Sequence, residues 1–224
     1  MRHSDLLAIR VRGPFAVFSA PAFKVERVSE SVMTPTAARG VLSAVLWKPA
    51  IEWRIERVQV LAPIQFTSFR RNEVNSRVPT LPASLIRDGG AGPVLYSDED
   101  RAQRNTVALR DVDYMIEARF FMTERAGRDD SVIKFEEIFR RRVARGQCFT
   151  MPYLGCREFV ADVLSPDGAP APIDDSRSLG RMVWDIVYEN HGGRARVHFF
   201  DAVLSRGILE VPPTPTITRL MELA

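Results

Sequence analysis

Three cations are spaced so that they share one side of a helix expected over residues 131–145. Taking 100° per residue, Lys134, Arg141 and Arg145 fall within about 20° of one line. Oriented cations neutralise the negative charge that develops when a phosphoryl group is attacked. Lys134 is also one of three lysines among the 31 basic residues of the chain. The pattern predicts a phosphate-directed site at Lys134, although a solvated helix face would carry similar charges.

Neither a metal site nor a nucleotide-binding loop is recognisable in the sequence. The histidines His3, His191 and His198 are scattered, and no cluster of His, Cys or carboxylate residues has metal-ligand spacing, so we expect no metal and no cofactor. The run Gly89-Gly90 lacks the helix and the lysine that follow in a Walker loop, and no GxSxG motif is present. His191 stands between Asn and Gly, which favours a turn.

Composition limits the class of protein. The 224 residues, 46% of them hydrophobic, suffice for one good core or for one core and a smaller second one. No apolar run approaches the ~20 residues that span a bilayer, and no signal-peptide pattern is seen, so we expect a cytoplasmic protein without membrane contact. Cys148 and Cys156 are expected to be free thiols. The abundance of Arg permits a nucleic-acid partner, since guanidinium groups bind phosphates with two hydrogen bonds. GC-rich codon usage would produce the same abundance of Arg.

The elements that position Lys134 can be predicted from periodicity. Thr34 is a good helix cap with Pro35 at the first helical position, and the helix should stop at Lys48-Pro49. A strand follows from Ile51, with a bulge expected at Arg57-Val58, where the apolar phase changes. The later helix has Ser131 as its cap, Gly146 at its end and an apolar stripe formed by Val132, Phe135, Phe139 and Val143.

The order of elements predicts an α+β fold with two domains. Strands expected over 6–12, from Ile51 onward, over 106–120 and over 158–164, with the two helices, give a ferredoxin-like βαββαβ domain over 1–165. RNA-recognition modules use this arrangement. Residues 70–105 show no sustained periodicity and are expected to form a long loop. Residues 166–224 are predicted to form a small antiparallel β domain with strands over 182–188, 195–204 and 208–211, followed by a peripheral C-terminal tail.

Four segments together resemble a known family. TPTAARG, LWKP, APIQ and, far downstream, YLGCREF stand in the order and spacing of the CRISPR-associated protein five, subtype d (type I-C), of the repeat-associated superfamily. The resemblance implies a ferredoxin-like N-terminal domain and a β-rich C-terminal domain. It implies cleavage of precursor CRISPR RNA at the repeat hairpin without metal, by attack of a ribose 2′-hydroxyl on the adjacent phosphate. It also implies retention of the 5′ handle within a surveillance complex with other subunits, and in some members binding of duplex DNA.

The catalytic residues of the family carry over only in part. The family lysine matches Lys134, whereas the family tyrosine position holds Leu46 and the family histidine position holds Phe135. Leu46 and Phe135 cannot move protons. The candidate substitutes are Tyr153, Tyr114 and His191.

These observations leave three hypotheses. The favoured one is an endoribonuclease, the second a non-catalytic RNA-binding subunit that caps the 5′ handle, and the third a binder of duplex DNA. For any of them, the residues expected to contact nucleic acid are Lys48, Arg10, Arg12, Arg39, Arg54, Arg70, Arg71, Arg141 and Arg145.

Overall fold

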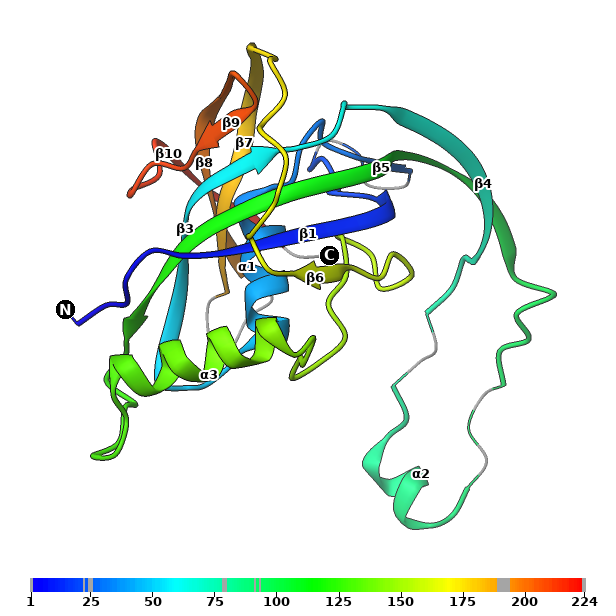
Figure 1. The fold of residues 1–224 in the computed structure, drawn as a ribbon. Coiled ribbons are helices and arrows are strands. Elements are labelled where there is room, and N and C mark those ends of the chain that lie inside the picture. Colours follow the sequence, from blue (N-terminus) through cyan, green and yellow to red (C-terminus); the bar gives the residue numbers. More distant parts are fainter. Residues whose placement is uncertain are drawn as a thin grey trace.

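The computed structural model describes residues 1–224 apart from 1, 22, 24–25, 78–79, 91, 93, 189–193 and 223–224. In chain order, its elements are β1 (Leu7–Ala16), β2 (Arg27–Val28), α1 (Pro35–Val45), β3 (Ile51–Val60), β4 (Phe66–Val74), α2 (Ala83–Arg87), β5 (Arg101–Met122), α3 (Val132–Ala144), β6 (Asp162–Leu164), β7 (Arg177–Tyr188), β8 (Arg194–Ser205), β9 (Ile208–Glu210) and β10 (Ile217–Glu222). The fold is α+β, with a curled and largely antiparallel sheet and few helices (Figure 1).

Strand β5 is the centre of this sheet. It pairs antiparallel with β1 on one side and with β3 on the other, and β6 pairs with the outer side of β1, giving the order β3-β5-β1-β6. The first part of β5 pairs with β4 and, in parallel, with β2. The register of β3 against β5 shifts between Ile55 and Arg57. This confirms the bulge predicted from the change of apolar phase, one or two residues earlier than expected.

Helices α1 and α3 cover this sheet through aromatic side chains. The Trp53 ring of β3 lies 4.9 Å from that of Phe139 in α3, and the Phe120 ring of β5 lies 6.3 Å from that of Phe135. The Trp53 indole also donates a hydrogen bond to the Leu46 carbonyl oxygen at 2.9 Å. Burying large rings that also satisfy their polar atom is strongly stabilising. These contacts hold α3 against β3 and β5, and the C-terminal end of α1 against β3.

Both long helices begin at the residues predicted from the sequence. The Thr34 hydroxyl accepts a hydrogen bond from the Ala37 N–H at 3.3 Å, and the Ser131 hydroxyl accepts one from the Lys134 N–H at 3.2 Å. Gly146 follows α3 with φ 62°, the left-handed conformation that ends helices and that glycine adopts without strain. The caps therefore predicted both starts and Gly146 the end of α3, whereas α1 ends at Val45, before the stop expected at Lys48-Pro49.

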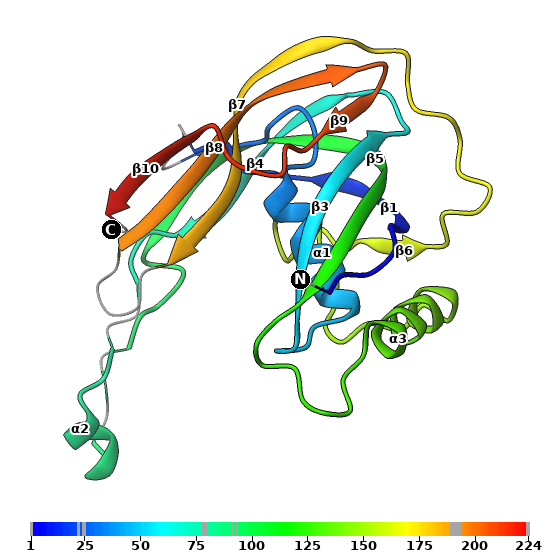
Figure 2. The ribbon, with the colours of Figure 1, turned by 90° about the vertical axis from the view of Figure 1, so that its left-hand side faces the viewer.

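The C-terminal strands continue the same sheet. β9 pairs with both β8 and β3, and the buried residues Met182, Phe200 and Leu209 belong to the same cluster as the core of the N-terminal part. Figure 2 shows the sheet curling so that β7, β8 and β10 lie at one end of the molecule and α3 at the other. The division into domains at residue 165 stays a prediction.

Two predicted segments differ from the structure. The long loop expected over 70–105 was wrong at both ends, because β4 runs to Val74 and pairs with β5, which begins at Arg101; α2 lies far from the sheet, at the outer end of the connection (Figure 1). Polar residues alternate between exposed and half-buried sites in β4, so no hydrophobic period marks it. The tail is also more structured than expected, since β10 pairs with β8.

No helix in the described ranges is long and apolar enough to cross a membrane. Within the same ranges, no three His, Cys, Asp or Glu side chains gather as metal ligands would.

Candidate nucleic-acid interface

A groove runs between α1 and β3, and three of the predicted basic residues line it. One hollow of about 110 Å³ is lined by Arg39, Glu52, Trp53 and Arg54, and an adjoining one of about 180 Å³ by Arg39, Trp53 and Lys48. We call the two together the α1–β3 groove. Arg39 comes from the helix, Lys48 from the turn that ends it, and Arg54 from the outward-facing side of β3. The fold thus gathers residues that lie up to 15 positions apart in the chain.

The three basic residues of the groove differ in the contacts that they make within the protein. Arg39 forms a two-pronged ion pair with Asp185 of β7, with nitrogen–oxygen distances of 2.7 and 2.5 Å. The Arg54 guanidinium lies 4.3 Å from the centroid of the Phe121 ring, and the side chain stays exposed. Lys48 is exposed as well. Arg39 therefore joins α1 to β7, whereas Lys48 and Arg54 face solvent.

Lys48 and Lys134 act on the same carboxylate. Asp130 precedes the cap of α3 and accepts hydrogen bonds from the Gly127 N–H at 3.0 Å and from the Lys134 ammonium group at 3.2 Å. These two bonds, followed by the positive charges of Lys134 and Lys48, lower the pKa of Asp130. The Thr123 hydroxyl donates to the Pro49 carbonyl oxygen at 2.7 Å, which ties the turn before α3 to the end of the groove. Lys134 thus hydrogen-bonds to Asp130, and the charge of Lys48 makes a smaller contribution to the lowered pKa of the same carboxylate.

The C-terminal ends of α1 and α3 meet beside Lys48. Arg142 donates to the Val45 carbonyl oxygen at 2.6 Å, and the Phe149 N–H donates to the Ala44 carbonyl oxygen at 2.7 Å. The Trp47 and Phe149 rings stack at this junction, with centroids 6.0 Å apart and an interplanar angle of 25°. Both rings are exposed, as are the predicted residues Arg141 and Arg145 on α3.

Leu46 and Phe135, which stand where the family resemblance implies a tyrosine and a histidine, are core residues in this structure. Leu46 is 0% exposed and Phe135 is 2% exposed. Leu46 packs in the core beside Trp53, and Phe135 forms part of the aromatic contact with β5. Their side chains serve packing rather than proton transfer.

The three residues proposed to replace the missing tyrosine and histidine in proton transfer do not share one environment. Tyr114 packs edge-on against Phe18 in the core, where burial raises the pKa of its phenol, so the expectation that it reaches a substrate is corrected. Tyr153 is 42% exposed and forms an isolated backbone bridge with Val160. His191 lies outside the described residues.

The remaining predicted arginines divide into paired and exposed ones. Arg10 on β1 forms a two-pronged pair with Asp113 on β5, with nitrogen–oxygen distances of 2.9 and 2.5 Å, so its charge is largely neutralised and the expected role in phosphate contact is weakened. Arg12 and Arg70 are exposed. Arg71 belongs to the polar network described next.

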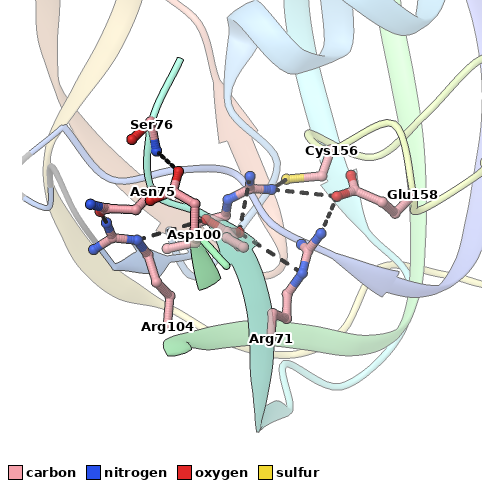
Figure 3. A network of polar contacts seen from close by, with 9 residues as sticks. Arg71, Asn75, Ser76, Asp100, Arg104, Cys156 and Glu158 are labelled. Atoms are coloured by element: carbon pink, nitrogen blue, oxygen red, sulfur yellow. Dashed lines mark hydrogen bonds and ion pairs between the residues drawn. The ribbon is translucent and has the colours of Figure 1, made fainter. Parts of the chain in front are cut away.

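Arg71 lies in a network at the base of the β4–β5 hairpin (Figure 3). It forms an ion pair with Glu158, and its Nε lies 4.0 Å from a Glu73 oxygen. Arg27 contacts the same two carboxylates and the Cys156 sulfur, the last at 3.3 Å. These contacts lower the pKa of Glu158, chiefly through the Arg71 hydrogen bond. The network joins β2, β4 and the segment before β6, so the primary contacts of Arg71 are within the protein.

Four residues of the candidate site were not found from the sequence. Asp130 was overlooked because it stands in a turn, where acidic residues are common. Arg142 lies one position from the stripe of cations, and its reach to α1 depends on the crossing of the two helices. The stacking of Trp47 on Phe149 joins residues about 100 positions apart, and only the LWKP segment drew notice to its surroundings.

Comparisons with known proteins agree on one family. The model of the Cas_Cas5d family, CRISPR-associated protein (Cas_Cas5), matches residues 6–211. The chain is 43% identical over 219 residues to a Mannheimia succiniciproducens protein named CRISPR pre-crRNA endoribonuclease Cas5d, covering 94% of this chain and 96% of the relative. It is 36% identical over 222 residues to a protein of the same name from Thermus thermophilus, covering 92% and 91%.

A solved structure shares the fold. A functionally uncharacterized protein from Streptococcus mutans is 21% identical and matches 98% of this chain and 99% of its own, with a TM-score of 0.69. A crystal structure described as a CRISPR-associated protein matches with the same TM-score and identity.

Proposed function

The chain belongs to the Cas5d family of CRISPR-associated proteins, and from this we propose that it is an endoribonuclease that cleaves precursor CRISPR RNA within the repeat and retains the 5′ handle. Two relatives that span most of the chain are named for this activity. In the proposed reaction the ribose 2′-oxygen bonds to the adjacent phosphorus while the bond from phosphorus to the 5′-oxygen breaks. The 2′-hydroxyl loses its proton and the 5′-oxygen gains one, leaving a 2′,3′-cyclic phosphate and a 5′-hydroxyl.

The single observation that carries this proposal is the fixed position of Lys134, whose ammonium group hydrogen-bonds to Asp130. The reacting phosphate gains negative charge in the transition state, and fixed cations stabilise that charge without having to reorganise. Lys134 is anchored by Asp130 and by the Asp129 carbonyl oxygen, both at 3.2 Å. Its ammonium group still has a third proton to donate. Lys134 is therefore proposed as the catalytic cation, with Asp130 as a positioning residue and Lys48 as a second cation whose charge also lowers the pKa of Asp130.

The proton-transfer groups are assigned by exposure. Asp130 is a weak base, because its pKa is lowered. Tyr153 is the exposed member of the pair of tyrosine candidates, and it stays the proposed proton donor or acceptor. His191 stays a prediction, since it falls among residues that the structure does not describe.

The proposed path of the RNA follows the exposed cations. Lys48 and Arg54 lie in the α1–β3 groove, and Arg141 and Arg145 lie on α3. Exposed guanidinium groups bind phosphates with charge-assisted hydrogen bonds. Arg12 and Arg70 are proposed as further contacts. Arg10, Arg39 and Arg71 are proposed to support the interface through their carboxylate partners.

The N-terminal part is proposed to be ferredoxin-like. The antiparallel order β3-β5-β1-β6 with α1 and α3 between the strands in sequence supports this arrangement. The C-terminal strands are proposed as the second, β-rich unit. A cytoplasmic location is proposed with the function.

A second candidate function is a non-catalytic subunit that binds the 5′ handle within a surveillance complex. The observation that favours it is the burial of Leu46 and Phe135 at the family's tyrosine and histidine positions. Binding of duplex DNA is compatible with either function, since the same exposed cations would serve.

The test is cleavage of the hairpin repeat RNA from the protein's own locus, under single-turnover conditions and in EDTA. Wild type is compared with Lys134→Ala, with the charge-conserving Lys134→Arg, and with a substrate carrying 2′-deoxyribose at the cut site. The expected result is cleavage by wild type that is lost with Lys134→Ala and with the deoxy substrate. Tight binding by wild type without any cleavage would contradict the endoribonuclease and favour the handle-binding subunit.

A further inference from the structure

The Trp47–Phe149 pair is an aromatic surface that the fold leaves open. Trp47 is 52% exposed and Phe149 is 56% exposed, although the two rings stack on one another. The exposed area must therefore lie on the sides that face away from the partner ring. By contrast, Trp53 is only 4% exposed and belongs to the core. Large aromatic rings left in water in this way are typical of a binding surface.

The pair is held in place by the backbone at the end of α1. The N–H groups of Phe149 and Thr150 both donate to the Ala44 carbonyl oxygen, at 2.7 and 3.1 Å. Arg142 binds the next carbonyl oxygen, that of Val45. Pro49 restricts the backbone just after Trp47. The platform is thus preorganised, which limits the entropy lost when a ligand stacks on it.

The surroundings of the pair are positively charged. Lys48 follows Trp47 directly, and Arg142 lies beneath the junction; Arg145 ends α3 four residues before Phe149. A protein partner with an apolar surface would not require the cations Lys48, Arg142 and Arg145 near the aromatic pair. Aromatic rings bordered by cations are the combination that binds single-stranded nucleic acid, because bases stack while phosphates are neutralised.

We propose that Trp47 and Phe149 form a stacking platform for an unpaired base of the repeat RNA, next to Lys48, which binds the neighbouring phosphate. This inference rests on the proposed function and adds the part of the substrate that the site recognises, a single-stranded nucleotide flanking the hairpin. Stacking is tolerant of base identity, since each base has a π face. The platform therefore positions the single-stranded RNA without recognising its sequence.

The test measures binding of two RNAs by fluorescence anisotropy. One is the repeat hairpin with its single-stranded flanks, and the other has abasic sites throughout those flanks. The variants are Trp47→Ala, Phe149→Ala and Trp47→Phe, with Tyr188→Ala as the matched control, since Tyr188 is an aromatic residue of β7 with 66% exposure. Thermal unfolding of each variant checks that the fold is retained.

We expect Trp47→Ala and Phe149→Ala each to weaken binding of the intact RNA by about 5- to 150-fold, the range measured for loss of one stacked base. Trp47→Phe keeps a ring and should lose less. On the abasic RNA, the affinity of these variants should equal that of wild type for the same abasic RNA. Tyr188→Ala should have wild-type affinity for both RNAs. Stacking should also quench tryptophan fluorescence in wild type, and Trp47→Phe should remove that quenching.

Two different failures can be told apart. If wild type binds and cleaves the repeat but the alanine variants bind it equally well, the platform is overturned and the proposed function stands; the exposed rings would then serve a protein contact. If wild type neither binds nor cleaves the repeat, both proposals are overturned together.

Discussion

Arg142 of α3 donates a hydrogen bond to the carbonyl oxygen of Val45, the last residue of α1, at 2.6 Å. The contact joins the C-terminal ends of two helices that are 97 residues apart in the chain. A carbonyl in the last turn of a helix has no partner within the helix, and a cation there also interacts favourably with the helix dipole. One guanidinium group therefore stabilises α1 and sets the position of the Trp47–Lys48 segment that follows it.

Replacement of Arg142 should lower stability, whereas replacement of its neighbour should not. We expect Arg142→Ala to reduce the free energy of unfolding by about 1.5–3 kcal/mol, because a hydrogen bond to a charged group is lost. Arg141→Ala is the matched control, since it removes the same charge from the exposed side of the same turn, and it should change the free energy by less than about 0.5 kcal/mol. Urea denaturation of both variants measures the difference. Equal losses would show that the Val45 contact does not contribute.

The pKa of Asp130 should report both lysines. It lies below its ordinary value of 3.8 because of the Gly127 N–H, Lys134 and Lys48. Carbon-detected NMR titration should show that Lys134→Ala raises this pKa, that Lys48→Ala raises it less, and that the double variant raises it most. The bond from Gly127 persists in all three, so none should reach the unfolded value. Arg141→Ala should leave it unchanged, and an unchanged pKa in the double variant would contradict the shared carboxylate.

The same shift determines how stability depends on pH. Because the folded pKa of Asp130 is lower than the unfolded one, its contribution is present in full above about pH 4 and is lost as the pH falls through the folded value. In Lys134→Ala the folded pKa lies closer to the unfolded one, so the contribution of Asp130 should be smaller and its loss should be complete at a higher pH than in wild type. Thermal unfolding between pH 2 and 6 measures it.

The sequence was sufficient for the elements that local signals define. The Thr34 and Ser131 caps, Pro35 and Gly146 set the ends of the two helices, because these residues act on the backbone next to them. β4 could not be predicted, since its stability comes from main-chain pairing with β5 and its residues are mostly polar. Local periodicity carries no information about a partner strand that is distant in sequence.

The candidate site was predictable only in part, for a related reason. Lys48 and Lys134 were identified from a segment match and from their rarity. The contact of Lys134 with Asp130, and the contribution of Lys48 to the lowered pKa of that carboxylate, depend on the turn before α3, which is tied to Pro49 by the Thr123 hydroxyl. The charge of Arg10 was visible in the sequence, but its neutralisation by Asp113 was not. In the β1–β5 register Arg10 pairs with Met115, and Asp113 lies two residues away along β5, on the same face of the sheet, where the Arg10 side chain reaches it diagonally.

Phe135 should matter for stability and not for chemistry. It is buried against Phe120, so Phe135→Ala should lower the free energy of unfolding by about 3–5 kcal/mol. Phe135→Leu keeps most of the volume and should fold with a smaller loss. Under conditions where it is fully folded, Phe135→Leu should cleave repeat RNA at the wild-type single-turnover rate. Loss of cleavage by a folded Phe135→Leu would place this position in the reaction after all.

Restoring the family residue at position 46 should not help. Leu46 is fully buried, so Leu46→Tyr would overpack the core and should cost about 1–3 kcal/mol. We expect this variant to melt at a lower temperature and to cleave no faster than wild type, whereas the volume-conserving Leu46→Met should be close to wild type in both. A faster rate for Leu46→Tyr would show that the core can open to admit the phenol to the substrate.

The salt dependence of RNA binding should separate exposed arginines from paired ones. Each phosphate contact releases counterions, so the slope of log K against log salt should fall in magnitude by about 0.7–0.9 when a contacting cation is removed. Arg145→Ala should show this change, because its guanidinium is exposed on α3. The double variant Arg10→Ala/Asp113→Ala removes a pair that is already neutral, and its slope should match wild type. If both variants change the slope equally, the carboxylate partner does not prevent Arg10 from contacting phosphate, and the RNA path must extend over β1. If neither does, the proposed contact of Arg145 with the RNA is contradicted.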